Sequence, residues 1–258
     1  MILQLLPSTI DERGVPGPGQ HLTCFVIDDS VAFDAGSLAM SVSLRQREQI
    51  RDIVLTHAHL DHIAGLPLFI DDLFASLTEP VRIHARREVI EVLDQDIFNW
   101  RVYPRFSELK NENGPVLEYR EFGPNDEFAA AHLSIRPISV NHKVPSSGFL
   151  ISDGGTTIAI TGDTAETDEF WDVVNQQPFL SALLIECAFP DEMSELADIS
   201  HHLTPSRMKR ELEKFEAAGC PIYAINLKPM YRDLIVKEIA AGNDRKVEVL
   251  EVGRIYVF

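Results

Sequence analysis

The sequence has few cysteines and a marked shortage of basic side chains. Its 258 residues include three cysteines, Cys24, Cys187 and Cys220, and no Cys-x-x-Cys pair. We therefore expect neither a disulfide framework nor a thiolate zinc site, and a cytoplasmic location fits best. With 23 Lys and Arg against 40 Asp and Glu, the formal net charge is −17. This balance argues against a nucleic acid polymer as partner, although bound cations can still attract a small phosphate compound.

Long hydrophobic runs are also missing. No apolar run approaches the ~18 residues of a membrane span, so we expect no membrane partner. The first residues, MILQLLPSTIDER, lack a basic start and reach Pro7 and Asp11 early, which is not the pattern of a secretory signal. Apolar residues make up 45% and charged residues 24% of the chain, as in ordinary globular proteins. We expect one domain over residues 1–258.

Strand-like and helix-like segments occur in both halves of the chain. Short apolar segments predict strands at residues 21–28, 31–34, 53–56, 81–85, 116–122, 133–140, 148–152, 156–161, 182–186, 222–225, 247–251 and 254–258. Amphipathic segments predict helices at residues 63–75, 86–97, 166–174, 204–218 and 232–240. No linker or sequence repeat is found. This distribution predicts an α/β fold in which two sheets pack face to face with helices outside, a four-layer αββα sandwich.

The segment His57-Ala58-His59-Leu60-Asp61-His62 is the strongest chemical signal. In an extended loop, residues two apart point the same way, so His57 and His59 can meet one metal ion. A turn into a helix at Asp61 would bring Asp61 and His62 toward a second position. Neutral imidazoles and a carboxylate suit zinc, manganese or iron. The N-terminal end of the helix expected after the motif would favour an anionic substrate.

Two further candidate residues follow predicted strands, and a third, Asp34, ends one. His142 comes after the strand at 133–140, and Asp163 comes after the strand at 156–161. Alone, they would be read as a surface or core histidine and a turn residue, but beside the histidine motif both are predicted metal ligands. Asp34, before Ala35 and Gly36, is either a carboxylate that orients a ligating histidine or a simple turn residue.

In this order, Asp34-Ala35-Gly36, the motif at 57–62, His142 and Asp163 resemble the metallo-β-lactamase superfamily, whose members place two metals between two β-sheets. The resemblance covers nearly the whole chain. Five short segments more narrowly resemble the class II cyclic nucleotide phosphodiesterases, which hydrolyse the 3′-ester of cyclic AMP or cyclic GMP. These segments are THAHLDHIAGL at 56–66, IFNWRVYPRF at 97–106, ECAFP at 186–190, HLTP at 202–205 and NLKP at 226–229.

The resemblance implies two divalent ions, zinc, manganese or iron, and a metal-bridging hydroxide that attacks the phosphorus of a small phosphodiester. The first ion would take the ligands His57, His59, His142 and Asp163. The second would take Asp61, which also counts as catalytic, together with His62 and the bridging Asp163. Family members supply another histidine before a Lys-Pro pair, where this chain has Asn226. An amide oxygen binds zinc more weakly than imidazole does, so the second site is expected to be the weaker one.

Glu186 and His202 form a second candidate pair. In the related ribonuclease Z enzymes, a Glu–His dyad is thought to protonate the leaving group, which can contribute ~10²–10⁴-fold to the rate. The alternative is that Glu186 ends a buried strand and His202 merely precedes a helix. His201 is expected to face solvent.

The aromatic residues Phe98, Trp100, Tyr103 and Phe106 offer a base-stacking wall, a local core or a subunit contact. Arg101 and Arg105 either meet the phosphate or belong to a solvated face. A homodimer is possible.

The function favoured by these features is hydrolysis of 3′,5′-cyclic nucleotides, with cyclic AMP the first to try. One rival is a hydrolase of the same fold that acts on a lactone, a thioester or an RNA 3′ end. The other is a catalytically weak nucleotide- or metal-binding protein that has lost its second metal site through Asn226.

Overall fold

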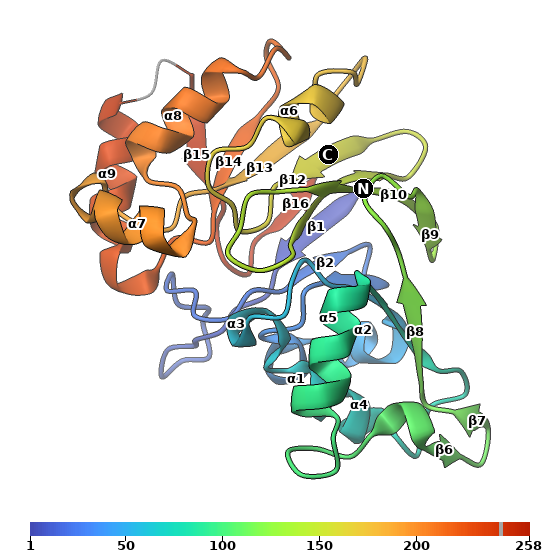
Figure 1. Cartoon of the computed structure of the whole chain (residues 1–258). Helices are drawn as coiled ribbons and strands as arrows, with labels where there is room; N and C mark the ends of the chain where they lie inside the picture. Colours follow the sequence, from blue (N-terminus) through green and yellow to red (C-terminus); the bar gives the residue numbers. More distant parts are fainter. Residues whose placement is uncertain (243–244) are drawn as a thin grey trace. The chain divides into compact units, whose positions relative to one another are not determined.

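The computed structural model describes residues 1–242 and 245–258, which fall into two compact units. Unit 1 comprises Met1–Gly17, Leu22–Gly123 and Val252–Val257, and unit 2 comprises Pro18–His21, Pro124–Glu251 and Phe258. Each unit is built on one large sheet (Figure 1). The assignment of residues 1–258 to a single domain stays a prediction.

The sheet of unit 1 has seven strands in the order β16-β1-β2-β3-β4-β5-β8. Their bounds are Ile255–Val257, Ile2–Leu5, Phe25–Ile27, Val31–Phe33, Asp52–Val54, Val81–Ala85 and Leu117–Glu121. The pairs from β16 to β3 are antiparallel, and the pairs from β3 to β8 are parallel. A separate small hairpin joins β6 (Lys110–Asn111) to β7 (Gly114–Pro115).

The sheet of unit 2 also has seven strands, in the order β15-β14-β13-β12-β11-β10-β9. Their bounds are Val247–Val249, Ile222–Ile225, Ala182–Glu186, Thr157–Ile160, Ser147–Ser152, Leu133–Ser139 and Phe128–Ala130. Here too, three antiparallel pairs, from β9 to β12, are followed by three parallel pairs, from β12 to β15. The two units therefore share one pairing scheme, a structural repeat that the sequence did not show.

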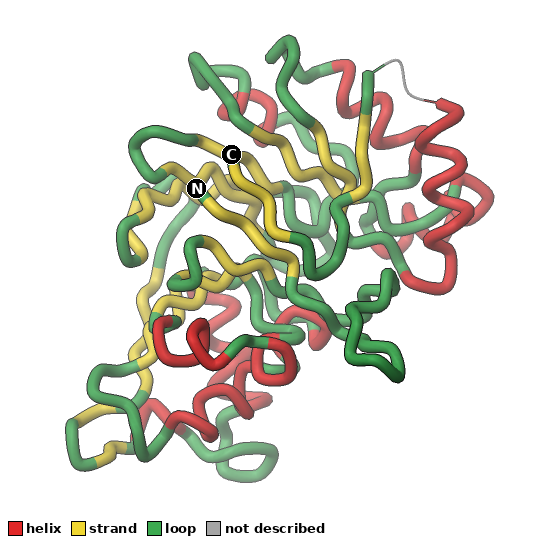
Figure 2. The backbone as a smooth tube through the Cα atoms, turned by 180° about the vertical axis from the view of Figure 1, so that it is seen from behind, coloured by secondary structure: helices red, strands yellow, loops and turns green. Residues whose placement is uncertain are grey.

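Helices cover one face of each sheet (Figure 2). Those of unit 1 are α1 (Leu38–Ser41), α2 (Leu44–Gln49), α3 (Leu60–Ile63), α4 (Leu66–Leu73), α5 (Arg87–Val92), the π-helix η1 (Leu93–Ile97) and the 3₁₀ helix η2 (Phe106–Glu108). Those of unit 2 are α6 (Glu169–Val174), η3 (Asp191–Met193), α7 (Ser194–Ser200), α8 (Pro205–Glu213), η4 (Pro229–Tyr231) and α9 (Arg232–Gly242). Among the described residues, no helix is long and apolar enough to cross a membrane.

Each unit has its own apolar core between sheet and helices. In unit 1, Phe69 and Ile70 of α4 and Val89 of α5 pack with Ile53 and Ile83 of the sheet. In unit 2, the core joins α6, α8 and α9 to the sheet through Phe170, Trp171, Met208, Leu212, Ile235, Leu183 and Ala224. Burial of large apolar side chains, at about 1.5–3 kcal/mol each, is what holds the helices on the sheets.

The helix predicted at residues 63–75 corresponds to α4, and the separate short helix α3 overlaps the predicted range only at Ile63. The break is at Gly65, whose N–H donates to the carbonyl oxygen of Ala35 at 2.9 Å. A Cβ at position 65 would lie 2.6 Å from that oxygen. Only glycine permits this close approach of two backbones, so the helical pattern is interrupted there.

The helix predicted at residues 204–218 ends earlier, at Glu213 of α8. Pro205 occupies the first turn as expected, but the Thr204 side chain makes no cap hydrogen bond. Asn175 ends the helix because its side chain bonds both the carbonyl of Lys214, at 2.8 Å, and the N–H of Glu216, at 3.0 Å. The helix predicted at 86–97 begins as α5 and continues as the π-helix η1.

Asp52, at the start of β4, makes the main buried ion pair of the sheet in unit 1. Arg82 donates to its two carboxylate oxygens at 2.8 Å each, and Nε2 of His84 lies 2.8 Å from one of them. Burial alone would raise the pKa of Asp52, but these hydrogen bonds and charges hold the pKa well below its usual value. Because the unfolded chain binds the proton more readily, Asp52 stabilises the fold above about pH 4 and loses this effect as the pH falls.

We expect Asp52→Asn to lower the free energy of unfolding by about 2–4 kcal/mol at pH 7, and by less at pH 3. Urea denaturation at both pH values measures this. Glu79→Gln is the matched control, because Glu79 also binds Arg82, at 2.8 Å, but is exposed, so about 0.5 kcal/mol is expected. An equal loss at both pH values would contradict the assignment.

Candidate functional site

The predicted site residues follow the carboxyl ends of parallel strands within each unit. In unit 1, Asp34 follows β3 and His57 comes shortly after β4. In unit 2, Asp163 comes shortly after β12, Glu186 ends β13 and Asn226 follows β14. Ligands of open α/β sheets bind beyond this edge, because the loops there are free to carry polar side chains.

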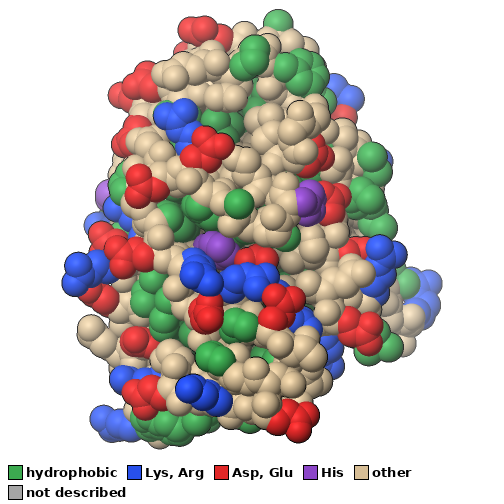
Figure 3. All heavy atoms as spheres, turned by 90° about the vertical axis from the view of Figure 1, so that its right-hand side faces the viewer, with side chains coloured by type: hydrophobic (Ala, Val, Ile, Leu, Met, Phe, Trp, Pro, Cys, Tyr) green, Lys and Arg blue, Asp and Glu red, His purple; other side chains and the backbone are tan. Residues whose placement is uncertain are grey.

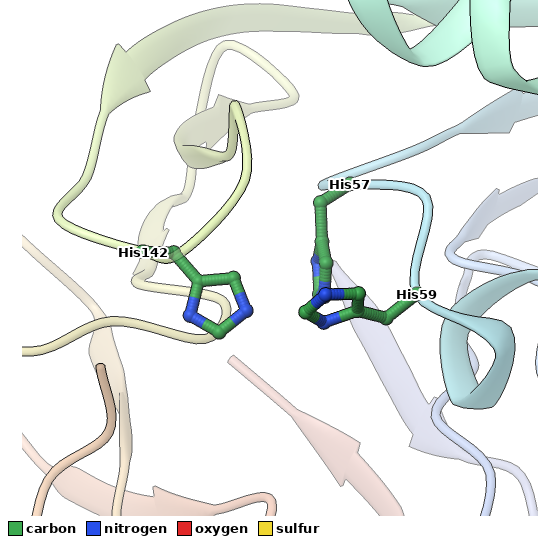
Figure 4. Close-up of side chains that lie close together, drawn as sticks. All are labelled: His57, His59 and His142. Carbon is green, nitrogen blue, oxygen red and sulfur yellow. The ribbon is translucent and has the colours of Figure 1, made fainter. Parts of the chain in front are cut away.

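Three imidazoles gather in the loop after β4. The ring of His57 lies 4.6 Å from that of His59 and 4.2 Å from that of His62, between centroids. His57 and His62 are buried, and His59 is half-buried at the N-cap position before α3. Figure 4 shows the adjacent rings of His57 and His59, and draws His142 on the loop after β10. The motif thus concentrates nitrogen donors in one place.

The carboxylate of Asp34 determines, directly or through Thr56, which ring nitrogen carries the proton in two of these histidines. Its Oδ2 lies 2.6 Å from Nδ1 of His62, and a carboxylate only accepts, so Nδ1 donates and Nε2 keeps its lone pair. Thr56 donates its hydroxyl to Asp34, at 2.9–3.0 Å, and its Oγ1 lies 2.9 Å from Nδ1 of His57. Both histidines are therefore held by Nδ1, as metal-ligating histidines are.

Asp61 is half-buried, in the first turn of α3, and its carbonyl oxygen accepts from the N–H of Thr23 at 2.8 Å. The helix expected after the motif begins at Leu60, but α3 has only four residues. Attraction of an anion by its N-terminal end stays a prediction.

In unit 2, donor atoms of His142, Asp163 and His202 all lie within 4.8 Å of one another. Asp163 and His202 are buried, with exposed fractions of 3% and 7%. One nitrogen of His202 lies 4.0 Å from Oδ2 of Asp163, and the rings of His202 and His142 are 5.1 Å apart. Two imidazoles and a carboxylate form a second donor set, one that includes His202 itself.

Asn226 contacts Asp163 through its amide nitrogen. Nδ2 donates to Oδ1 of Asp163 at 2.5 Å, and the residue has a left-handed φ of 59°. Asparagine tolerates this conformation better than most residues do. The amide therefore presents a donor to the carboxylate, where the expected metal-facing role needs the oxygen.

The Glu186 and His202 side chains form a buried hydrogen-bonded pair. Nδ1 of His202 bonds Oε1 of Glu186, whose other oxygen accepts from the N–H of Leu203 at 2.6 Å. Burial raises the pKa of Glu186 to about 7, against the opposing charge of His202. Burial would lower the pKa of His202, but the charge and hydrogen bond of Glu186, together with the charge of Asp163, raise it. The pair is thus able to hold a proton near neutral pH.

Main-chain and side-chain hydrogen bonds tie the loops of this cluster together. Asn141 donates its main-chain N–H to Oγ1 of Thr164 at 3.2 Å, and its carbonyl accepts from Ala165 at 2.7 Å. His201 is half-buried, so it faces solvent in part, and its Nδ1 lies 3.0 Å from Oδ1 of Asn141. Sequence reasoning missed Asn141 and His201, and their only signal was adjacency to His142 and His202.

The aromatic segment at 98–106 is mostly core. Phe98 and Phe106 are 0% and 1% exposed, and Tyr103 packs against the same cluster, so of the three alternatives these rings form local core and not a base-stacking wall. Arg105 donates to the carbonyl oxygens of Phe98 and Asp94, at 3.0 and 3.3 Å, which assigns it a structural role. In contrast to the buried rings of Phe98 and Phe106, the side chain of Trp100 is 57% exposed.

The molecular surface carries side chains of both charges. On the face drawn in Figure 3, Lys and Arg side chains are interspersed with Asp and Glu side chains.

A cavity of about 610 Å³ in unit 2 is lined by residues 217–223, 245, 246 and 248. It contains none of the predicted site residues, so we assign no chemistry to it.

The donor sets fit divalent metal ions. Buried imidazoles are neutral ligands, and His57 and His62 keep their Nε2 lone pairs because hydrogen bonds hold Nδ1. Asp163 adds a buried carboxylate. Nitrogen with carboxylate oxygen is the combination that zinc, manganese and iron accept.

Comparison with known proteins agrees with this chemistry. Residues 24–219 match the model of the β-lactamase superfamily domain. The chain is 28% identical over 235 residues to a Yersinia pestis protein named probable 3′,5′-cyclic-nucleotide phosphodiesterase, covering 79% of this chain and 66% of that protein. Other curated relatives are named ribonuclease Z. The chain spans about half to two thirds of the length of the phosphodiesterase relatives.

Solved structures show the same fold. Unliganded yeast PDE1 has a TM-score of 0.77 at 17% identity, with 98% of each chain covered. The metallo-β-lactamase fold protein YhfI from Bacillus subtilis has a TM-score of 0.73 at 18% identity, with 99% of each chain covered. The predicted fold class, its two large sheets and the resemblance to a hydrolase superfamily are confirmed. The chain therefore belongs to the β-lactamase superfamily and has the metallo-β-lactamase fold.

Proposed function

We propose that this protein is a metal-dependent phosphodiesterase that hydrolyses small 3′,5′-cyclic nucleotides. The observation that carries the proposal is the motif at 57–62, in which Asp34 and Thr56 hold His57 and His62 by Nδ1. The names of several relatives, including the Yersinia pestis protein, support the substrate class.

We propose the following metal ligands: His57, His59, Asp61, His62, His142, Asp163 and, more weakly, Asn226. When bound, divalent ions would polarise the phosphoryl oxygens and lower the pKa of a nucleophilic water. Asp34 orients His62 and, through Thr56, His57. Asn226 donates to Asp163 and so restrains the direction of that carboxylate.

The Glu186–His202 pair serves the leaving group in this proposal. An alkoxide such as the 3′-oxygen of a cyclic nucleotide needs a proton as the ester bond breaks. His202, whose pKa Glu186 helps to raise, is able to donate one, while Glu186 keeps the ring oriented through Nδ1.

The charge of the chain favours a small substrate over a polymer. A net charge of −17 disfavours a long polyanion, whereas a cyclic nucleotide carries a single negative charge. The relatives named ribonuclease Z make an RNA 3′ end the main alternative substrate. A cytoplasmic location and a homodimer stay predictions.

We expect manganese- or zinc-loaded protein to hydrolyse cyclic AMP or cyclic GMP at least tenfold faster, in kcat/KM, than bis-p-nitrophenyl phosphate. Steady-state assays with both nucleotides, the aryl diester, 2′,3′-cyclic nucleotides, a lactone, a thioester and a short RNA measure this. Elemental analysis of the same preparations counts the metal.

The controls separate the alternatives. His132→Ala, an exposed histidine on the turn before β10, should leave every rate unchanged, whereas His57→Ala should abolish them. Preferential hydrolysis of the lactone, the thioester or the RNA would replace the substrate class. Less than one metal per chain in every preparation would favour a binding protein.

A further inference from the structure

His142 is held by the main chain of a residue far away in the sequence. Its Nδ1 lies 3.0 Å from the carbonyl oxygen of His201, at the end of α7. Because a carbonyl oxygen only accepts, Nδ1 carries the proton and Nε2 keeps its lone pair. Histidine ligands of metals usually have this arrangement, in which the second nitrogen donates to a carbonyl or carboxylate.

The conformation of His201 is unusual for a non-glycine residue. It is the C-cap of α7, with φ 55° and ψ 62° in the left-handed region. This region is accessible to Gly, Asn and, less readily, His, but it is very unfavourable for β-branched residues. The carbonyl group that meets His142 therefore depends on a backbone state that few residues adopt.

The side chain of His201 makes a second contact with the loop that carries His142. Its Nδ1 lies 3.0 Å from Oδ1 of Asn141, and Nδ2 of Asn141 donates to the carbonyl of Glu166 at 2.8 Å. With Nδ2 so engaged, Oδ1 of Asn141 is the acceptor and Nδ1 of His201 the donor. His142 and its neighbour Asn141 are thus both bonded to His201, one by its main chain and one by its side chain.

We propose that His201 is a positioning residue that fixes the tautomer and direction of His142, so that Nε2 is preset to bind a metal ion. The inference rests on the proposed function, in which His142 is a metal ligand. His201 and Asn141 form a clamp across the loop after β10. The same clamp reaches the loop of Asp163, since Asn141 is also bonded to Thr164 and Ala165.

The test measures the zinc dissociation constant by competition with a chromophoric chelator. His201→Val, which cannot adopt the left-handed conformation without strain, should weaken zinc binding tenfold to a hundredfold. His201→Gly, which adopts it freely, should weaken binding less than about fivefold, although it removes the whole side chain. His132→Val, the matched control at an exposed position of the same unit, should bind zinc like the unsubstituted chain.

Nitrogen chemical shifts of His142 give a readout that does not depend on metal. Long-range ¹H–¹⁵N spectra of the metal-free protein should show a protonated Nδ1 at His142, and a mixture of tautomers in His201→Val. If His201→Val does not fold, His201→Ala replaces it, with an expected weakening of about tenfold. A glycine variant as impaired as the valine variant would overturn the role of the left-handed main chain.

A double variant separates this inference from the function on which it rests. In His142→Ala, adding His201→Val should cause no further loss of zinc affinity, because the effect of His201 passes through His142. If His142→Ala binds zinc like the unsubstituted chain, the proposed ligand set is wrong. If His142→Ala weakens binding but His201→Val does not, the ligand set stands and the clamp is overturned.

Discussion

His202→Ala is expected to lower kcat for a 3′,5′-cyclic nucleotide by about 10²–10⁴-fold while leaving the rate on bis-p-nitrophenyl phosphate within about threefold. The cyclic nucleotide releases an alkoxide, which needs the proton that the Glu186–His202 pair holds. The p-nitrophenolate leaves without one. Steady-state assays of both substrates with metal-loaded enzyme give the ratio directly.

The position of His202 beside His142 and Asp163 makes a second measurement necessary. Their donor atoms lie within 4.8 Å of one another, so His202 is also placed to bind a metal ion. Metal content should be unchanged in His202→Ala if the residue serves the leaving group. Equal losses on the two substrates, accompanied by loss of metal, would make His202 a ligand instead. His132→Ala, at an exposed position before β10, serves as the control.

Gly36→Ala is expected to lower the free energy of unfolding by about 3 kcal/mol, and the thermal midpoint by roughly 6–12 °C. A Cβ at this position would lie 2.0 Å from the carbonyl oxygen of Asp61 and 2.7 Å from the main-chain nitrogen of Thr23. Both are backbone atoms, so neither can move aside as a side chain would. Because Asp61 belongs to the histidine motif, zinc affinity should fall as well.

Gly155→Ala is the matched control, because the atom nearest its added Cβ is Oδ1 of Asp153 at 3.6 Å, an ordinary contact. Its thermal midpoint should change by less than about 2 °C. Calorimetry of both variants, with and without zinc, measures the two effects. An unchanged midpoint in Gly36→Ala would show that the backbone crossing at Asp61 is looser than the structure has it.

Local sequence patterns predicted most of the strands and the histidine motif. β13 is a short apolar run that ends at Glu186, and β5 alternates apolar with polar residues, and both patterns are visible within a few residues of sequence. The motif at 57–62 is local for the same reason, because its rings meet through spacing within one loop. The contact of Glu186 with His202 came from the family resemblance, not from a local pattern.

Tertiary structure decided the features that depend on close contact between segments far apart in the sequence. Gly65 ends α3 because the carbonyl of Ala35 occupies the space of a side chain, and no helical periodicity contains that information. Phe98 and Phe106 entered the core because the loop between them folds back onto α4. The sequence pattern of an aromatic segment is the same whether the segment lies in the core or on the surface.

The sequence by itself determined which donors are present, since their residue types and order predict a metal site. These donors are His57, His59, His62, His142 and Asp163. Only the tertiary structure decided which ring nitrogens carry a proton and in which direction the donor atoms point. Nδ1 of His62 meets Asp34, 28 residues away, and Nδ1 of His142 meets His201, 59 residues away. Hydrogen bonds between such distant positions follow from the packing of strands and helices into each unit, and no local pattern in the chain encodes them.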